Sequence, residues 1–388
     1  MCAGGKSGTW RELLLESWIR IHMGAKELQD AESKKERRAP LILGLQPSAM
    51  LDHIARVDWS LLDQIPGDRG GSQPVAIEEL EHILNELKTH ILPIPDDPSP
   101  IITIAGGSVA NTIRGLTVGF QITSGIIGAF ADDEQGRLFV QNMSSNGVNL
   151  SRMRSKNGPT AQCVCLVDAV GHRTMRPCLS NAVKLQADEL TAEDFRGSKW
   201  LVMRYAISNL EVLRAAIRIA KQEGVCVSLD LASFEMVRNS KSQLLELLES
   251  GDIDLCFANE DEAKELLRGE QNAGPEAVVE FLAKHCQWAV VTLGPNGCIV
   301  KHGKEMVRVP AIGGTTATDA TGAGDLFASG FLYGLVKGLS LENCCRVGSC
   351  SGGSVIRSLG GEVTPENWQW MYKQMEVKGL PLPDFCKS

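Results

Sequence analysis

Short apolar runs alternate with segments of helical periodicity from residue 41 onward. A short apolar run bounded by polar or glycine positions is typical of a buried strand, whereas apolar residues at i, i+3, i+4 and i+7 indicate one face of a helix. The strands predicted in this way are Val225–Asp230, Ile253–Ala258 and Ala289–Leu293, and the helices are Leu210–Gln222, Asp261–Arg268 and Pro275–Cys286. This alternation predicts an α/β fold with a doubly wound, mainly parallel sheet flanked by helices.

Residues 163–176 depart from this alternation. Cys163–Asp168 and Arg173–Arg176 are both strand-like and Gly171 lies between them, so the segment is predicted to form a β-hairpin. A hairpin attached to a parallel core either covers a ligand site or forms a plain sheet edge, and the pattern alone favours neither. We expect a small β lid built from discontinuous segments, including about residues 158–180.

The two ends of the chain are predicted to lie outside the folded domain. Residues 1–40 contain a short amphipathic segment and then a charged stretch that offers little to bury, so we expect a flexible N-terminal tail. One domain is predicted over residues 41–375, with a C-terminal tail over residues 376–388.

Residues 1–22 have two interpretations. They are either an extension upstream of a start at Met23 or a targeting segment, although Glu12 and Glu16 are unusual in a transit peptide. The predicted location is the cytoplasm, or a plastid or other organelle if the segment targets the protein.

Charge and cysteine content exclude several classes of protein. The 39 basic and 47 acidic residues give a formal net charge of −8, which argues against a basic surface for nucleic acid or anionic membrane. No apolar run approaches the roughly 20 residues of a membrane-spanning helix. The twelve cysteines include no Cys-x-x-Cys pair, the nearest approach being Cys163-Val-Cys165, so we expect reduced, packed thiols rather than a zinc site. We predict a monomer or homodimer with a small-molecule partner.

The densest chemical signal is the glycine-rich stretch over residues 313–325, which precedes an apolar helical run, Leu326–Val336. A glycine turn that enters a helix leaves backbone N–H groups unpaired, and with the helix dipole they form an anion site suited to phosphate. Asp325 lies beside these donors, where a carboxylate can accept a proton from an attacking hydroxyl group. The alternative is that Asp325 only caps the helix.

Residues 319–325, DATGAGD, resemble the second signature, DTxGAGD, of the ribokinase/PfkB-type carbohydrate kinases. Residues 106–111 (GGSVAN) are similar to the first glycine signature of this family, residues 259–262 (NEDE) to its NxxE motif, and residues 292–297 (TLGPNG) to its TxGxxG nucleotide loop. These motifs in this order are specific, although each alone is weak. Ala320 replaces the usual Thr beside the monovalent-cation loop, which leaves potassium dependence open.

The resemblance implies a ribokinase-like fold and a role for each matching residue. Asp325 is the implied catalytic base, with the N–H groups of Gly322, Ala323 and Gly324 stabilising the transferred phosphoryl group. The implied substrate-binding residues are Asp52, Gly106, Gly107, Asn111 and Asp325, and the implied nucleotide-binding residues are Asn259, Thr292, Gly294, Gly297, Gly322 and Gly324. Glu262 is implied to hold Mg²⁺ through water, and Asp319 to contact a monovalent cation such as K⁺.

Structural readings compete with some of these roles. Asn259 and Glu262 also fit a helix N-cap with its capping carboxylate, and Gly106-Gly107 also fits a turn before a helix. Asp52 follows Gly44 at one residue more than the usual spacing.

The implied reaction is transfer of the γ-phosphoryl group of ATP to a hydroxymethyl group. Residues 158–163 (GPTAQC) and the Asn181-Ala182 region resemble the adenosine-kinase branch, so the predicted acceptor is a nucleoside, phosphorylated on its ribose 5′-hydroxyl group. A free sugar is the alternative acceptor. A catalytically inactive kinase fold that serves as a binding module is the alternative of a different class.

Overall fold

The computed structural model describes residues 39–92, 101–313 and 317–387. Residues 1–38 lie outside these ranges, as do residues 314–316 of the glycine-rich stretch. The predicted tail except its last two residues, and the segment over residues 1–22 with its two interpretations, therefore fall outside the described part of the chain.

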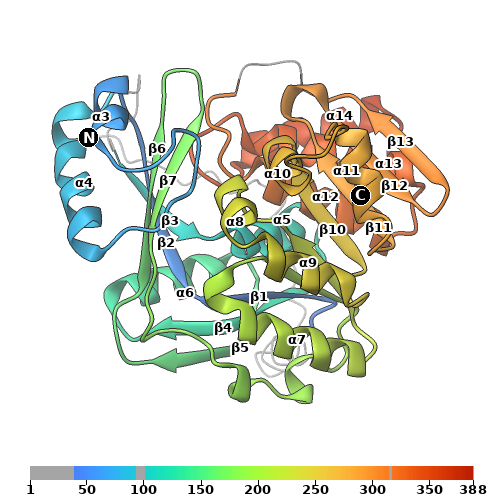
Figure 1. Ribbon diagram of the computed structural model, residues 1–388, viewed down its shortest axis with the longest axis horizontal. Coiled ribbons are helices and arrows are strands. Elements are labelled where there is room, and N and C mark those ends of the chain that lie inside the picture. The colour runs from blue at the N-terminus through green and yellow to red at the C-terminus, as the bar shows by residue number, and fades with distance from the viewer. Residues whose placement is uncertain (1–38, 93–100, 314–316, 388) are drawn as a thin grey trace, which may run out of the picture. The chain divides into compact units, whose positions relative to one another are not determined.

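A nine-stranded sheet forms the centre of the domain (Figure 1). Its spatial order is β13-β12-β11-β10-β9-β8-β1-β4-β5, and every neighbouring pair from β11 to β5 is parallel, whereas β12 and β13 are antiparallel at one edge. The strands are β1 (Ile42–Ser48), β4 (Ser124–Ala131), β5 (Asn149–Lys156), β8 (Trp200–Arg204), β9 (Cys226–Asp230), β10 (Leu255–Asn259), β11 (Trp288–Thr292), β12 (Cys298–His302) and β13 (Glu305–Val309).

Helices cover both faces of this sheet because successive residues of the parallel strands point to opposite sides. Ile42 packs into the core on one face and Leu43 into the core on the other. The first core includes α5 (Ser108–Phe120), α6 (Glu134–Ser145), α12 (Ala323–Val336), α13 (Leu341–Val355) and α14 (Pro365–Val377). The second includes α7 (Leu210–Gln222), α8 (Phe234–Asn239), α9 (Lys241–Glu249), α10 (Glu260–Leu266) and α11 (Pro275–Leu282).

A second sheet of four strands, in the order β3-β2-β6-β7, forms the lid. Its strands are β2 (Met50–Arg56), β3 (Ile102–Gly106), β6 (Ala161–Val167) and β7 (Arg173–Cys178). The outer face, with Ala55, Val164 and Leu166, packs against α3 (Trp59–Gln64) and α4 (Ile77–His90), as Figure 1 shows at the blue end of the chain. The inner face, with Ile54, Ile104 and Met175, forms a separate apolar cluster.

The predicted elements correspond closely to the observed ones. The predicted hairpin is confirmed as β6 and β7, which pair antiparallel, and the predicted helix over Leu210–Gln222 has those bounds in α7. The doubly wound, mainly parallel architecture with a smaller lid sheet is confirmed as well.

The C-terminal boundary differs from the prediction. Helix α14 continues past residue 375 to Val377, and Met375 and Leu380 are both buried in the first core. The ring of Phe385 lies edge-on to that of Tyr372, with centroids 5.6 Å apart. Residues 376–387 therefore pack on the domain rather than extend from it as a tail, because their apolar side chains complete the core beside α13.

No helix in the described part of the chain is both long enough and apolar enough to cross a membrane.

Candidate active site

Polar residues occupy the carboxyl ends of four neighbouring parallel strands. Arg204 ends β8 and is in register with Asp230, which ends β9. Asn259 ends β10 and is in register with Thr292 at the end of β11. In open α/β sheets ligands bind outside the carboxyl ends of the strands. This edge of the nine-stranded sheet is therefore the candidate active site.

The turn between β3 and α5 is held by a side chain from β1. The Gln46 amide donates to the carbonyl oxygen of Gly106 (3.1 Å), and its Oε1 accepts the N–H of Ala110 (2.9 Å). Gly107 has a φ of +95°, in the left-handed region that favours glycine. The predicted first glycine signature therefore forms a fixed turn that delivers α5 to the site.

Asp52 lies directly against this turn. Its side chain is 1% exposed, and a Cβ atom on Gly106 would collide with its carboxyl group. Burial raises the pKa of Asp52 to about 7, Arg114 opposes that rise, and Asp325 adds to it. Oδ1 of Asp52 has no hydrogen-bond partner among the described residues. The carboxylate is thus a buried acceptor with free capacity.

Asn111 and Arg114, one turn apart on α5, form a short relay to Asp325. The Asn111 Nδ2 donates to Oδ2 of Asp325 (2.9 Å), and the Arg114 guanidinium donates to Oδ1 of Asn111 (2.9 Å). Arg114 is itself held by the carbonyl oxygen of Ala105 (2.9 Å). Because Arg114 can only donate, it turns the amide so that its NH₂ group faces Asp325.

Asp325 lies in the first turn of α12, after Gly322, whose φ is +77°. The backbone carbonyl oxygen of Asp325 accepts from Thr112 Oγ1 (3.2 Å) and from Ser329 Oγ (2.9 Å). The carboxyl group of Asp325 is positioned separately, by its hydrogen bond from Asn111. Burial raises the pKa of Asp325, and the Asn111 hydrogen bond with the charges of Arg204 and Arg173 opposes this rise. A raised pKa suits a general base better than an ordinary aspartate pKa does.

One of the predicted phosphate-facing N–H groups is engaged elsewhere. The N–H of Ala323 donates to the carbonyl oxygen of Ala320 (3.2 Å), which closes the turn before α12. The prediction that the Ala323 N–H points to phosphate therefore does not match this arrangement. Gly324 is exposed, and a Cβ atom there would meet no heavy atom within 4 Å. The space beside Gly324 is open to a ligand.

Arg204 is a site residue that the sequence patterns missed. Its guanidinium donates to Ser108 Oγ (2.6 Å) and to the carbonyl oxygen of Ala232. Ala232 has a φ of +78°, a strained conformation for a residue with a side chain, and Oδ1 of Asp230 holds its N–H (2.8 Å). The only available signal was an arginine at the end of an apolar strand. Arg114 was missed too, because an arginine inside a helix is usually solvated.

A pocket joins these groups. Ser108 and Thr112 of α5, Arg204 of β8, Asp230 of β9 and Asp325 of α12 all line it. Burial raises the pKa of Asp230 as well, while Arg204 lowers it. The pocket therefore places carboxyl groups of raised pKa next to a guanidinium, a combination that can accept a proton and neutralise an anion.

Asn259 and Glu262 form the capping box at the start of α10. The Asn259 side chain accepts the N–H groups of Asp261 and Glu262, and its own N–H and amide donate to the two Glu262 oxygens (2.8 and 2.7 Å). Burial raises the pKa of Glu262 to about 8, and the charge of Asp230 adds to the rise. The interpretation of these two residues as a helix cap therefore matches the structure, and the magnesium role of Glu262 stays a prediction.

The other predicted nucleotide residues are placed around the β11–β12 turn. Thr292 Oγ1 donates to the carbonyl oxygen of Ala258 (3.4 Å), and Gly294 is exposed. Gly297 has a φ of +89°, and a Cβ atom there would collide with the backbone of Val309 and Pro310. The requirement for glycine at 297 is thus explained by the contact with β13.

Asp319 is fully buried and ties two loops together. Its Oδ1 accepts the N–H of Thr321 and its Oδ2 that of Gly360 (both 2.8 Å). The tip of the lid hairpin reaches the same segment, since the N–H of Ala320 donates to the carbonyl oxygen of Gly171 (3.0 Å). Asp319 therefore shapes the turn on which the lid rests, and its cation role stays a prediction.

Comparisons with known proteins identify the family. A family model described as pfkB family carbohydrate kinase matches residues 95–367. The chain is 27% identical over 243 residues to an uncharacterised sugar kinase of Archaeoglobus fulgidus, covering 62% of this chain and 93% of that protein. It is 25% identical over 305 residues to adenosine kinase 2 of Arabidopsis thaliana, covering 71% of this chain and 85% of that protein.

Solved structures resemble the whole domain. A probable sugar kinase from Rhizobium etli superposes with a TM-score of 0.76 at 28% identity, covering 88% of this chain and 99% of that one. The adenosine kinase from Sinorhizobium meliloti superposes with a TM-score of 0.76 at 29% identity, covering 85% and 98%.

Proposed function

Because this chain belongs to the pfkB family of carbohydrate kinases, and is thus a phosphotransferase with an alcohol group as acceptor, we propose that it transfers the γ-phosphoryl group of ATP to the 5′-hydroxyl group of a nucleoside. The raised pKa of Asp325 and its hydrogen bond from Asn111 support its role as the base that accepts the hydroxyl proton.

Phosphoryl transfer depends mainly on positioning and charge neutralisation. Arg204 and Arg173 both act electrostatically on Asp325, so two guanidinium groups lie near the predicted point of transfer. The open space at Gly324 supports approach of phosphate to the start of α12, where the helix dipole favours an anion. A Mg²⁺ ion would supply further charge neutralisation on ATP. Glu262 and Asn259 fit it as ligands that act through water. Burial and the charge of Asp230 disfavour the ionised form of Glu262, and a nearby cation would stabilise that form.

The inner face of the lid is the observation that favours a nucleoside over a free sugar as the acceptor. On the inner face of the lid, Asp52 is in register with Ile104 and lies two residues from Ile54. Both belong to the apolar cluster that also includes Met175. A ribose ring held by Asp52 would leave an attached base against this apolar face, whereas a free sugar would present hydroxyl groups to it. The inner face therefore favours an acceptor that has both a sugar and an apolar ring.

A free sugar is the second candidate, because the Rhizobium etli neighbour is a probable sugar kinase and matches the fold as closely as the adenosine kinase does. An ADP-release assay with ATP and Mg²⁺ across purine nucleosides, pyrimidine nucleosides, pentoses and hexoses distinguishes the two. We expect kcat/KM to be highest for a nucleoside. Turnover of free sugars alone would establish the second candidate, and no ADP release with any acceptor would favour a binding module.

A further inference from the structure

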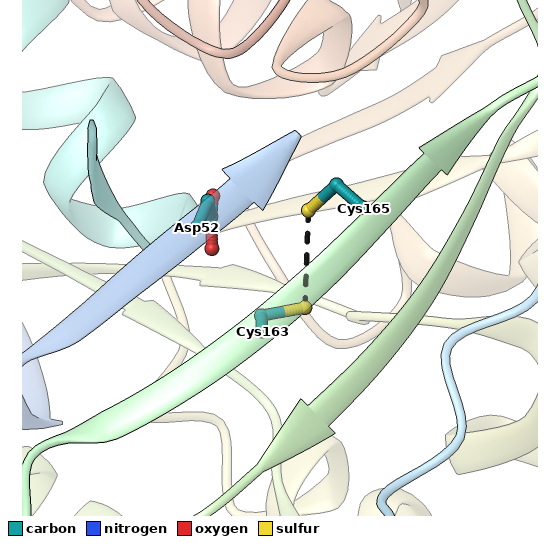
Figure 2. A group of neighbouring side chains, drawn as sticks. All are labelled: Asp52, Cys163 and Cys165. Carbon is teal, nitrogen blue, oxygen red and sulfur yellow. Dashed lines mark hydrogen bonds between the residues drawn. The ribbon is translucent and has the colours of Figure 1, made fainter. Parts of the chain in front are cut away.

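One group of side chains in the lid has the composition of a metal site. Asp52 of β2 and Cys163 and Cys165 of β6 each offer one ligand atom, and these atoms lie within 4.8 Å of one another (Figure 2). β2 and β6 are parallel neighbours with Asp52 in register with Cys163. Because side chains two residues apart on a strand share a face, Cys165 lies on the same side of the lid as the other two.

The two thiols already have the spacing of metal-bound thiolates. The Sγ atoms of Cys163 and Cys165 are 3.8 Å apart. A tetrahedral Zn²⁺ ion with Zn–S bonds of about 2.3 Å holds two thiolates roughly 3.8 Å apart. No rearrangement of the strand is needed to bring the two sulfur atoms to a common ion.

The third ligand is a buried carboxyl group, one oxygen of which has no partner. Asp52 is 1% exposed, and its Oδ1 is without a hydrogen bond among the described residues. A buried polar atom in this state costs free energy unless something binds it. This unpaired atom is independent of the cysteine pair and points to a ligand in the same place.

We propose that Asp52, Cys163 and Cys165 bind a thiophilic divalent cation such as Zn²⁺, and that the bound ion excludes the phosphoryl acceptor from Asp52. Binding releases the two thiol protons to solvent and changes no oxidation state. Two thiolates and one carboxylate around a divalent ion leave one negative charge. Arg114 and Arg204 both act electrostatically on Asp52 and would partly offset that charge.

The consequence is competition between the ion and the acceptor. The proposal rests on the predicted substrate role of Asp52 for this consequence alone, since binding of the ion needs no kinase activity. A bound ion would occupy the Asp52 carboxylate and so weaken acceptor binding without touching the predicted nucleotide residues on β10 and β11.

The test is titration of the reduced full-length protein with Cd²⁺, which reports thiolate ligands by its charge-transfer absorption. We expect one tight site per chain that Zn²⁺ displaces. The variant Cys163→Ala/Cys165→Ala loses this signal, and Asp52→Asn weakens binding by at least about 10-fold. The matched control is Cys298→Ala/Cys345→Ala, which removes a second buried, hydrogen-bonded cysteine pair and leaves the site intact.

Several results would overturn the proposal. They are absence of a thiolate signal in the folded wild-type protein, equal binding in the Cys163→Ala/Cys165→Ala variant, or loss of binding only in the control pair. Circular dichroism confirms that each variant is folded. If the double variant does not fold, Asp52→Asn carries the test, because it keeps both thiols. Acceptor competition is measured in the inactive variant Asp325→Asn, where a saturating nucleoside should raise the apparent Kd for Cd²⁺, and an unchanged Kd would refute the exclusion step.

Discussion

The two glycine turns of the site use glycine for opposite reasons. At Gly106 and Gly107 a methyl group would meet the Asp52 carboxyl group and the Gln46 amide, so the missing side chains make room for the protein itself. At Gly324 a Cβ atom would meet nothing within 4 Å. The first turn is closed around a buried carboxylate, and the second is open toward solvent.

The first turn fixes side chains of the site in advance, whereas the second leaves space for a ligand to enter. The Gly106-Gly107 turn holds Asp52, and through α5 it holds Asn111, before any ligand arrives. The start of α12 instead leaves room for a ligand that binds and dissociates. Substitutions at the two turns should therefore affect stability and turnover in different proportions, and four predictions test this comparison.

The largest effect is expected for Asp325→Asn. Loss of the base should lower kcat by about 10²–10⁴-fold while acceptor binding is retained, because Asn keeps the size of the side chain and can still pair with Asn111. Steady-state kinetics and acceptor titration measure the two effects. The exposed acid Asp261→Asn is the control, and near-normal kcat in Asp325→Asn would rule out its catalytic role.

The next effect is expected for Gly106→Ala. The added methyl group collides with the Asp52 carboxyl group, so the free energy of unfolding should fall by about 1–3 kcal/mol and acceptor KM should rise. Chemical denaturation measures the first change. In the double variant Gly106→Ala/Asp52→Ala the clash is absent, so the two stability losses should be less than additive. Strict additivity would contradict the contact.

The pH dependence of acceptor binding should follow Asp52. Its pKa is raised from 3.8 to about 7, so the carboxylate that accepts hydroxyl hydrogen bonds forms only as the pH rises through 7, and acceptor KM should fall over that range. In the ligand-free protein the stability contributed by Asp52 is fully present below pH 3.8 and is lost as the pH rises through about 7. Asp52→Asn should flatten both profiles, and an unchanged KM profile in that variant would assign the pH effect elsewhere.

The smallest effect on stability is expected for Gly324→Ala, and its sign is reversed. Ala fits the open helical position and should raise the free energy of unfolding by about 0.4–1 kcal/mol, while the methyl group should raise the KM for ATP. Gly330→Ala in the same helix is the matched control, because a Cβ atom there would lie 2.7 Å from the carbonyl oxygen of Val347 and should destabilise the protein. Destabilisation by Gly324→Ala would show that this turn is as tightly packed as the first.

The alternation of strand-like and helix-like segments predicted the architecture, because each segment is recognised from the local spacing of its apolar residues. The bounds of α7 follow from apolar residues on one helix face, and the β6–β7 hairpin follows from two strand-like runs around Gly171. The C-terminal boundary was missed because burial of Leu380 depends on the distant core beside α13, which no local pattern reports.

The sequence by itself determined which residues could bear the chemistry: an aspartate at a glycine-rich helix start, a glycine signature with Asn111, and a cysteine pair with no obvious role. Only the tertiary structure decided their partners. It placed Asn111 against Asp325, Arg204 near Asp325, and Asp52 opposite Cys163. The physical reason is that hydrogen bonds and Coulomb interactions act over a few ångströms in space, and the helices and strands that carry these partners lie far apart along the chain.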